Sequence, residues 1–199
     1  KTIEDSFAVN VIPVDDGPEV INGIADVSVE EDAPDFIVSL ANAFNDVDDD
    51  NNSIDKIVQA NSNPDLVSAT INGNTLTLDF QPDQSGSSTI TLLVSSNGKT
   101  IEDSFTVDVT PVDDGPEVIN GIVDVSVEED ASDFIVSLTN VFNDVDDDNA
   151  SIVKSVQANT NPGLLNATIS ANDLILDFQS NSYGSTTITV RGTSNGKTV

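Results

Sequence analysis

The residues best suited to chemistry in this sequence are carboxylates gathered in short clusters. The stretch FNDVDDDN occurs twice, at residues 44–51 and 142–149. In the first copy Asp46 and Asp48 alternate, so an extended loop places both carboxylates on one side, where they can converge on one cation. An EF-hand loop also needs glycine at its sixth position, which here is Asn51, and glutamate at its twelfth, which is absent. The stretch is therefore either a solvated turn or part of a larger calcium site.

Two further acidic clusters occur in each half of the chain. Glu30-Glu31-Asp32 follows a predicted strand, and Asp15-Asp16 precedes a Gly-Pro pair at a predicted domain boundary. Strand direction reverses at each turn, so the glutamate cluster should lie at the opposite end of its domain from the FNDVDDDN loop. In a tandem array the lower end of one domain then meets the upper end of the next. This predicts one junction that contains Glu30, Glu31, Asp32, Asp113, Asp114, Asp144 and Asp146, enough oxygens for two or more calcium ions.

Composition narrows the chemistry. The 199 residues contain 6 Lys+Arg against 35 Asp+Glu, a formal net charge of -29, which excludes the basic surface that nucleic acids require. Because there is no Cys and no His, thiolate chemistry, imidazole catalysis and zinc sites of the usual kind are excluded. Carboxylate, carbonyl and hydroxyl oxygens remain, and these ligands suit Ca²⁺. No apolar run approaches the length of about 18 residues that a membrane span needs.

The chain is an internal repeat. KTIEDSF at residues 1–7 returns at residues 99–105, an offset of 98 residues that aligns the two halves without a gap. A repeat of this length is long enough to form a complete domain, unlike the shorter units of solenoids. Residues 197–199 begin a third copy, so we expect the sequence to be a piece of a longer array.

Within each copy the apolar residues alternate with polar ones, as in half-buried strands. Leu76, Leu78 and Phe80 show this pattern, and Asn97-Gly98 predicts a tight hairpin between residues 89–96 and 100–110. About seven short strands per repeat indicate an all-β fold of two tandem antiparallel seven-stranded Greek-key β-sandwiches. The predicted organisation is residues 1–14 as the last strand of a preceding repeat or a swapped strand, 15–112 as the first repeat, and 113–199 as a second repeat without its final strand.

A sandwich without its final strand exposes unpaired backbone groups. We therefore expect either that residues 3–12 complete the second repeat of a neighbouring molecule by head-to-tail strand exchange, or that the repeat unit is permuted.

The stretch TVDVTPVDDGPEV at residues 106–118 resembles the last strand and linker of bacterial cadherin-like, immunoglobulin-like tandem repeats, which usually read Val-Asn-Asp-Ala-Pro. Glu30-Glu31-Asp32 is similar to the acidic stretch after that family's first strand, and Asp144-x-Asp146 to its Asp-x-Asp loop. The Asp-Arg-Glu motif of that family is absent, and Asn195 stands where an Asp is expected. The resemblance implies calcium between successive domains of a large surface adhesin, outside the cell. The metal ligands expected from spacing and resemblance together are Glu30, Glu31, Asp32, Asp113, Asp114, Asp144, Asp146, Asp148, Asn195, Asp15, Asp16, Asp46, Asp48, Glu128 and Glu129.

Three functional classes remain open at this point. The first is a structural extender whose neighbouring repeats are clamped by calcium. The second is a module that binds carbohydrate or a like domain, although only Tyr183 offers a loop aromatic for a sugar. The third is an enzyme, which we do not expect, because duplicated acidic clusters at a linker suit a repeating joint better than a catalytic cleft. No catalytic residue is predicted.

Overall fold

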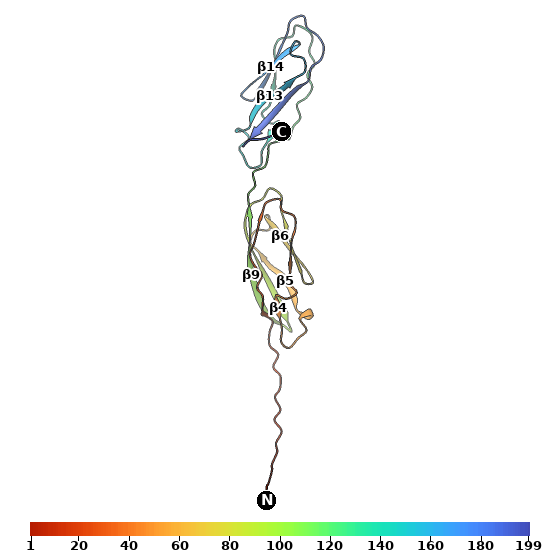
Figure 1. Cartoon of the computed structure of the whole chain (residues 1–199). Helices are drawn as coiled ribbons and strands as arrows, with labels where there is room; N and C mark the ends of the chain where they lie inside the picture. The colour runs from red at the N-terminus through yellow and green to blue at the C-terminus, as the bar shows by residue number, and fades with distance from the viewer. The chain divides into compact units, whose positions relative to one another are not determined.

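A computed structural model describes all residues 1–199 (Figure 1). The chain divides into two compact units, Lys1–Val112 and Asp113–Val199. Both are built from β-strands, as the sequence predicts, and the only helical segment is one turn of 3-10 helix, η1 (Asn51–Ser53). No helix is both long and apolar enough to cross a membrane.

Unit 1 is a sandwich of two sheets. The larger has the order β2-β9-β8-β5 and the smaller the order β3-β7-β6, while β1 and β4 form a short separate pair. The strands are β1 (Glu19–Val20), β2 (Val27–Glu30), β3 (Phe36–Ser39), β4 (Phe44–Asn45), β5 (Asp55–Asn61), β6 (Val67–Asn72), β7 (Thr75–Phe80), β8 (Gly86–Ser96) and β9 (Lys99–Thr110).

One strand pair departs from the antiparallel sandwich that the sequence predicts. β2 runs parallel to β9, with Val27 opposite Val107 and Val29 opposite Val109. No hairpin joins these two strands, so no short turn forces them to run in opposite directions. All other pairs are antiparallel.

The hairpin of β8 and β9 provides much of the core of unit 1. Asn97 and Gly98 both have positive φ, 46° and 82°, as a two-residue turn of this type requires. The turn sets the register from Ser96 opposite Lys99 onwards. Because side chains alternate along a strand, β9 directs Phe105, Val107 and Val109 into the space between the sheets.

Unit 2 repeats this plan, but its larger sheet has no strand that corresponds to β2. One sheet has the order β11-β15-β14, another the order β13-β16-β17, and β10 pairs with β12. The strands are β10 (Glu117–Val118), β11 (Phe134–Ser137), β12 (Phe142–Asn143), β13 (Val153–Asn159), β14 (Leu165–Ser170), β15 (Asp173–Phe178), β16 (Ile188–Ser194) and β17 (Lys197–Thr198). Residues 125–128, which correspond to β2, form no strand.

Residues 1–14, at the red end of Figure 1, form no strand. Their apolar side chains are exposed, among them Phe7 and Val11. The predictions that these residues end a preceding repeat or swap into a neighbour remain predictions at this stage.

Candidate metal centre

Three segments of unit 2 meet at the end where its chain enters. Asp113 and Asp114 precede β10, the loop 144–149 follows β12, and the turn Asn195-Gly196 joins β16 to β17. Pairing of Glu117 with Asn143 holds the first two segments together. We call the resulting group Asp113, Asp114, Asp144, Asp146, Asp147 and Asn195 the entry cluster of unit 2.

Asp144 is the buried centre of this cluster, with 5% of its surface exposed. Its Oδ1 accepts hydrogen bonds from the backbone N–H groups of Asp146 and Asp147, both at 3.1 Å. The backbone N–H of Asp144 donates to Oδ1 of Asn149 at 2.8 Å, so Asn149 closes the loop that the Asp-x-Asp spacing begins. The second oxygen of Asp144, Oδ2, is buried and has no hydrogen-bond partner.

The other members of the cluster are linked by hydrogen bonds around Asp144. The backbone N–H of Asp114 donates to Oδ2 of Asp146 at 2.6 Å. The side-chain amide of Asn195 donates to Oδ1 of Asp113 at 2.9 Å. The hydroxyl of Ser194 donates to Oδ2 of Asp147 at 2.7 Å.

Unit 1 has the same cluster at its own entry end. Asp46 is 4% exposed, and its Oδ2 is likewise buried without a partner. The backbone N–H of Asp16 donates to Oδ2 of Asp48 at 2.6 Å. The side-chain amide of Asn97 lies 2.7 Å from Oδ2 of Asp49 and 3.2 Å from Oδ1 of Asp15. The entry cluster of unit 1 is Asp15, Asp16, Asp46, Asp48, Asp49 and Asn97.

A lysine partly neutralises each cluster. Lys197 Nζ lies 3.2 Å from Oδ2 of Asp113, and Lys99 Nζ lies 3.2 Å from Oδ2 of Asp15 while also donating to the Asp15 carbonyl. The hydrogen bond from Asn195, followed by that from Lys197, lowers the pKa of Asp113 below its ordinary value. Asn97 and then Lys99 lower the pKa of Asp15 in the same way. Both carboxylates are exposed to solvent, so these ion pairs add little to stability.

The glutamate cluster lies at the other end of unit 1. Glu31 is buried, and its Oε1 accepts the backbone N–H of Val112 at 2.6 Å. Asp32 has a positive φ of 60°, and its Oδ1 accepts the backbone N–H of Asp83 at 3.2 Å. Glu30 is exposed.

In unit 2 the corresponding Glu128 and Glu129 are both exposed. Asp130 has a φ of 63°, and its Oδ1 accepts the backbone N–H of Asn181 at 2.7 Å. The aspartate after the glutamate pair, Asp32 or Asp130, therefore holds the loop that follows β7 in unit 1 and β15 in unit 2.

The structure thus gathers the predicted Asp-Asp pair, the Asp-x-Asp loop and the hairpin Asn at one end of each unit. It places Asp148 differently from the other predicted ligands: its Oδ1 accepts the backbone N–H of Ala150 at 2.9 Å and fixes a turn. The corresponding Asp50 caps η1 through Asn52. The grouping of Glu30, Glu31 and Asp32 with the entry cluster of unit 2 stays a prediction.

Several members of the clusters were not selected from the sequence. Asp49 and Asp147 are the third aspartates of their loops. Their spacing gives no reason to prefer them as cluster members over the fourth aspartates, Asp50 and Asp148. Lys99 and Lys197 were also missed, although they follow Asn-Gly in both repeats of a chain with only 6 basic residues. Ser96 and Ser194 precede the same turn, and nothing in the sequence distinguishes them from other hairpin serines.

The donor set of each cluster fits a hard divalent cation. A buried carboxylate oxygen without a partner is costly unless a positive charge or a hydrogen-bond donor reaches it. Besides the lysine, which pairs with the first aspartate, each cluster contains carboxylates, an amide and a hydroxyl, and Ca²⁺ prefers such oxygen ligands. The residues of each cluster that could contribute oxygens to a cation are Asp113, Asp144 and Asp146 in unit 2, and their counterparts Asp15, Asp46 and Asp48 in unit 1.

The sequence matches no protein-family model and no curated protein. Among solved structures, it is similar to human protocadherin-24 EC1-2, with 16% identity and a TM-score of 0.43, over 94% of this chain and 92% of that one. It is similar to the protocadherin gamma B7 extracellular cadherin domains 1-4, with 18% identity and a TM-score of 0.42, over 92% of this chain and 49% of that one.

It is also similar to the endo-fucoidan hydrolase MfFcnA4 from glycoside hydrolase family 107, with 16% identity and a TM-score of 0.39. That match covers 92% of this chain but only 28% of the hydrolase. Because every TM-score is below 0.5, these similarities do not assign the chain to a family.

Proposed function

We propose that these units are calcium-rigidified structural extender repeats of a large secreted or cell-surface adhesin, with Ca²⁺ bound near the interdomain junction. The observation that carries the proposal is the buried Oδ2 of Asp144, which has no hydrogen-bond partner within a cluster of oxygen ligands. The same atom of Asp46 repeats it in unit 1. The recurrence of this buried carboxylate oxygen in both repeats supports a repeated cation site rather than a solvated turn.

Electrostatics supports the same conclusion. Two carboxylates about 4 Å apart repel each other by about 4 kcal/mol at an effective dielectric constant near 20. The lysine of each cluster is paired with the first aspartate only, Asp15 or Asp113. A calcium ion would offset the repulsion among the remaining carboxylates, and protonation at low pH would release it, because the ligands must be ionised to bind.

Chain connectivity links this site to unit 1. The backbone N–H of Val112 donates to the buried carboxylate of Glu31, and Asp113 is the next residue along the chain. A calcium ion that takes Asp113 as a ligand would therefore restrain the residue adjoining the one that Glu31 holds. In a tandem array such restraint gives each repeat a fixed direction and lets many copies form a long stalk.

The double variant Asp113→Ala/Asp114→Ala tests the proposal. Neither residue belongs to the core of unit 2, so both units should stay folded while the calcium-dependent gain in rigidity is lost. Small-angle scattering with calcium and then with chelator measures the rigidity, and circular dichroism checks the fold. The control Asp133→Ala/Asp177→Ala removes two exposed acids outside the entry cluster and should keep the calcium response. An unchanged calcium response in Asp113→Ala/Asp114→Ala would contradict the proposal.

A further inference from the structure

We propose that Lys99 and Lys197 are exchangeable counter-ions of the entry clusters. Each lysine pairs with the first aspartate of its cluster and leaves that aspartate when a divalent cation binds. This inference rests on the proposed function, because the cation is the Ca²⁺ proposed for the same clusters. It adds that a lysine of the chain itself regulates each site, so that binding exchanges one cation for another.

The oxygens of Asp15 already have partners in unit 1. Oδ1 of Asp15 accepts a hydrogen bond from the side-chain amide of Asn97 at 3.2 Å, and Oδ2 lies 3.2 Å from Nζ of Lys99. Nζ of Lys99 also donates to the carbonyl oxygen of Asp15. A carboxylate can accept several contacts, but an ammonium and a divalent cation on the same carboxylate would repel each other at close range. The lysine is therefore the partner that has to leave.

Unit 2 has the same arrangement around its first aspartate. The side-chain amide of Asn195 donates to Oδ1 of Asp113 at 2.9 Å, and Nζ of Lys197 lies 3.2 Å from Oδ2. Two of the 6 basic residues of the chain thus lie at the same position of the two clusters. The pairing belongs to the repeat and is not a feature of one unit.

A glycine in each linker makes room for the lysine. A Cβ atom at Gly17 would lie 3.2 Å from Cβ of Lys99, and one at Gly115 would lie 3.3 Å from Cβ of Lys197. Both distances are shorter than the usual contact of about 3.5–4.0 Å between carbon atoms. The aliphatic part of each lysine therefore lies against the linker, and this position directs Nζ to the aspartate while the charged end stays in solvent.

The lysine does not satisfy the buried centre of the cluster. The side chains of Lys99 and Asp15 are 47% and 42% exposed, whereas Asp46 is 4% exposed and its Oδ2 has no hydrogen-bond partner. The cost of that buried charge remains while the lysine is in place. A divalent cation that contacts both aspartates removes this cost, and the released ammonium returns to water. The exchange therefore favours the divalent cation although it breaks an ion pair.

The lysine should also determine which cations bind. A monovalent cation such as Na⁺ replaces one positive charge by another and gains little from the exchange. A divalent cation adds net positive charge to a cluster of carboxylates, so its attraction exceeds that of the lysine. We expect the entry clusters to select divalent over monovalent cations for this reason.

Chemical labelling of the lysines tests the exchange directly. In chelator, an amine-acylating reagent should label Lys99 and Lys197 slowly, because an aspartate holds each Nζ. Addition of CaCl₂ should raise both labelling rates. Lys56 and Lys154 donate to backbone carbonyls outside the clusters, so their rates should change little. Mass spectrometry of the peptides measures the rate at each lysine.

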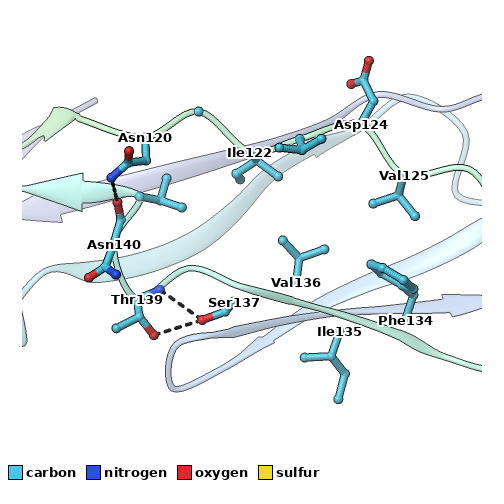
Figure 2. Close-up of a pocket in the computed structure, with 13 residues that line it drawn as sticks. Asn120, Ile122, Asp124, Val125, Phe134, Ile135, Val136, Ser137, Thr139 and Asn140 are labelled. Carbon is cyan, nitrogen blue, oxygen red and sulfur yellow. Dashed lines mark hydrogen bonds between the residues drawn. The ribbon is translucent and has the colours of Figure 1, made fainter.

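Carboxylate variants identify the partner of the lysine in unit 2. Asp113→Asn should raise the labelling rate of Lys197 in chelator, because the ion pair is lost. The control Asp124→Asn removes the same charge from an exposed residue, which Figure 2 shows pointing away from Val125 and Val136. It should leave the rate of Lys197 unchanged. Equal increases in the two variants would show that Lys197 responds to net charge alone and would overturn the proposal.

Calcium affinity gives a second readout that is resolved by unit. NMR titration with CaCl₂ can follow the hairpin amides of Gly98 and Gly196, one in each cluster. Lys99→Gln should tighten binding in unit 1 by roughly two- to fivefold, the value of an exposed ion pair, and leave unit 2 unchanged. Lys197→Gln should do the reverse. The control Gln59→Glu changes the net charge equally at an exposed position of β5 and should have far less effect, because distant charges are screened.

The outcomes separate this inference from the proposed function. If the wild-type chain binds calcium but the lysine variants bind it no more tightly than Gln59→Glu, the exchange is overturned and the calcium site stands. Labelling rates of Lys99 and Lys197 that do not change with calcium lead to the same conclusion. If the wild-type chain does not bind calcium even in millimolar CaCl₂, the proposed function and the exchange are both overturned.

Discussion

Units 1 and 2 have nearly the same sequence, yet they bury different amounts of it. Val27 is 7% exposed in unit 1, whereas its counterpart Val125 is 37% exposed in unit 2. Ile90 and Leu92 are fully buried, while Ile188 and Val190 are only partly buried. The difference in burial comes from β9, whose 12 residues lie between β2 and β8 in the larger sheet of unit 1. Burial of an alternating strand is therefore decided by its neighbours and not by its own pattern.

The two units have the same structure in the regions that β9 does not contact. Phe36 lies opposite Leu78 in unit 1, and Phe134 lies opposite Leu176 in unit 2, so the smaller sheets have the same register. The buried aspartates of the two entry clusters, Asp46 and Asp144, also have the same unpartnered oxygen. The entry cluster of unit 2 thus forms without strands that correspond to β2 and to the later part of β9.

The largest expected effect distinguishes the two copies of one phenylalanine. Phe105→Ala should reduce the free energy of unfolding of unit 1 by about 3–5 kcal/mol, because it leaves a cavity in a packed core. Phe7→Ala, measured at a concentration too low for association, should leave both units unchanged, because Phe7 is exposed. Urea unfolding followed by circular dichroism measures both variants. A comparable loss in Phe7→Ala would show that the first residues pack within their own unit.

A medium effect tests whether the two entry clusters are equivalent. In chelator, Asp144→Asn should raise the free energy of unfolding of unit 2 by about 1 kcal/mol, because the charge on a buried oxygen without a partner is removed. With calcium present, the same variant should lose affinity tenfold or more, about 1.4 kcal/mol. Calorimetric titration and thermal melting measure the two changes.

Asp46→Asn is the matched change in unit 1, and it should behave in the same way. The equivalence of the clusters would be refuted if only one of the two variants changed calcium binding. If both variants were destabilised in chelator but kept their calcium affinity, these carboxylates would stabilise the loop and would not bind calcium.

The smallest effect concerns the exposed carboxylates. Asn195→Ala removes the main cause of the lowered pKa of Asp113, so that pKa should rise toward its ordinary value in calcium-free buffer. A lowered pKa stabilises the fold above the pKa of the unfolded chain, and this contribution is lost as the pH falls through the folded pKa. In the variant the folded pKa approaches the unfolded pKa, so this contribution to stability becomes smaller at every pH above the unfolded pKa. Carbon-13 NMR of the Asp113 carboxyl measures the shift, and Asn97→Ala should do the same to Asp15.

Much of this arrangement could be predicted from the sequence. Alternating apolar residues and the Asn97-Gly98 turn give the strands and the central hairpin, because both depend on local backbone geometry. The Asp-x-Asp spacing and the Asp-Asp pair give most of the entry cluster. The role of Asp147 rather than Asp148 could not be predicted, because it depends on the position of the Ser194 hydroxyl across the turn. The parallel β2–β9 pair was also missed, since no short turn joins those strands.

The most direct test of the calcium account is small-angle scattering of the wild-type chain with saturating calcium and then with chelator, combined with thermal melting. It should be made at a concentration below that at which copies associate, so that strand exchange does not contribute. We predict that calcium raises the melting temperature and narrows the range of conformations between the units, and that chelator reverses both changes. An identical scattering profile and an identical melting temperature in the two buffers would contradict a calcium-rigidified extender.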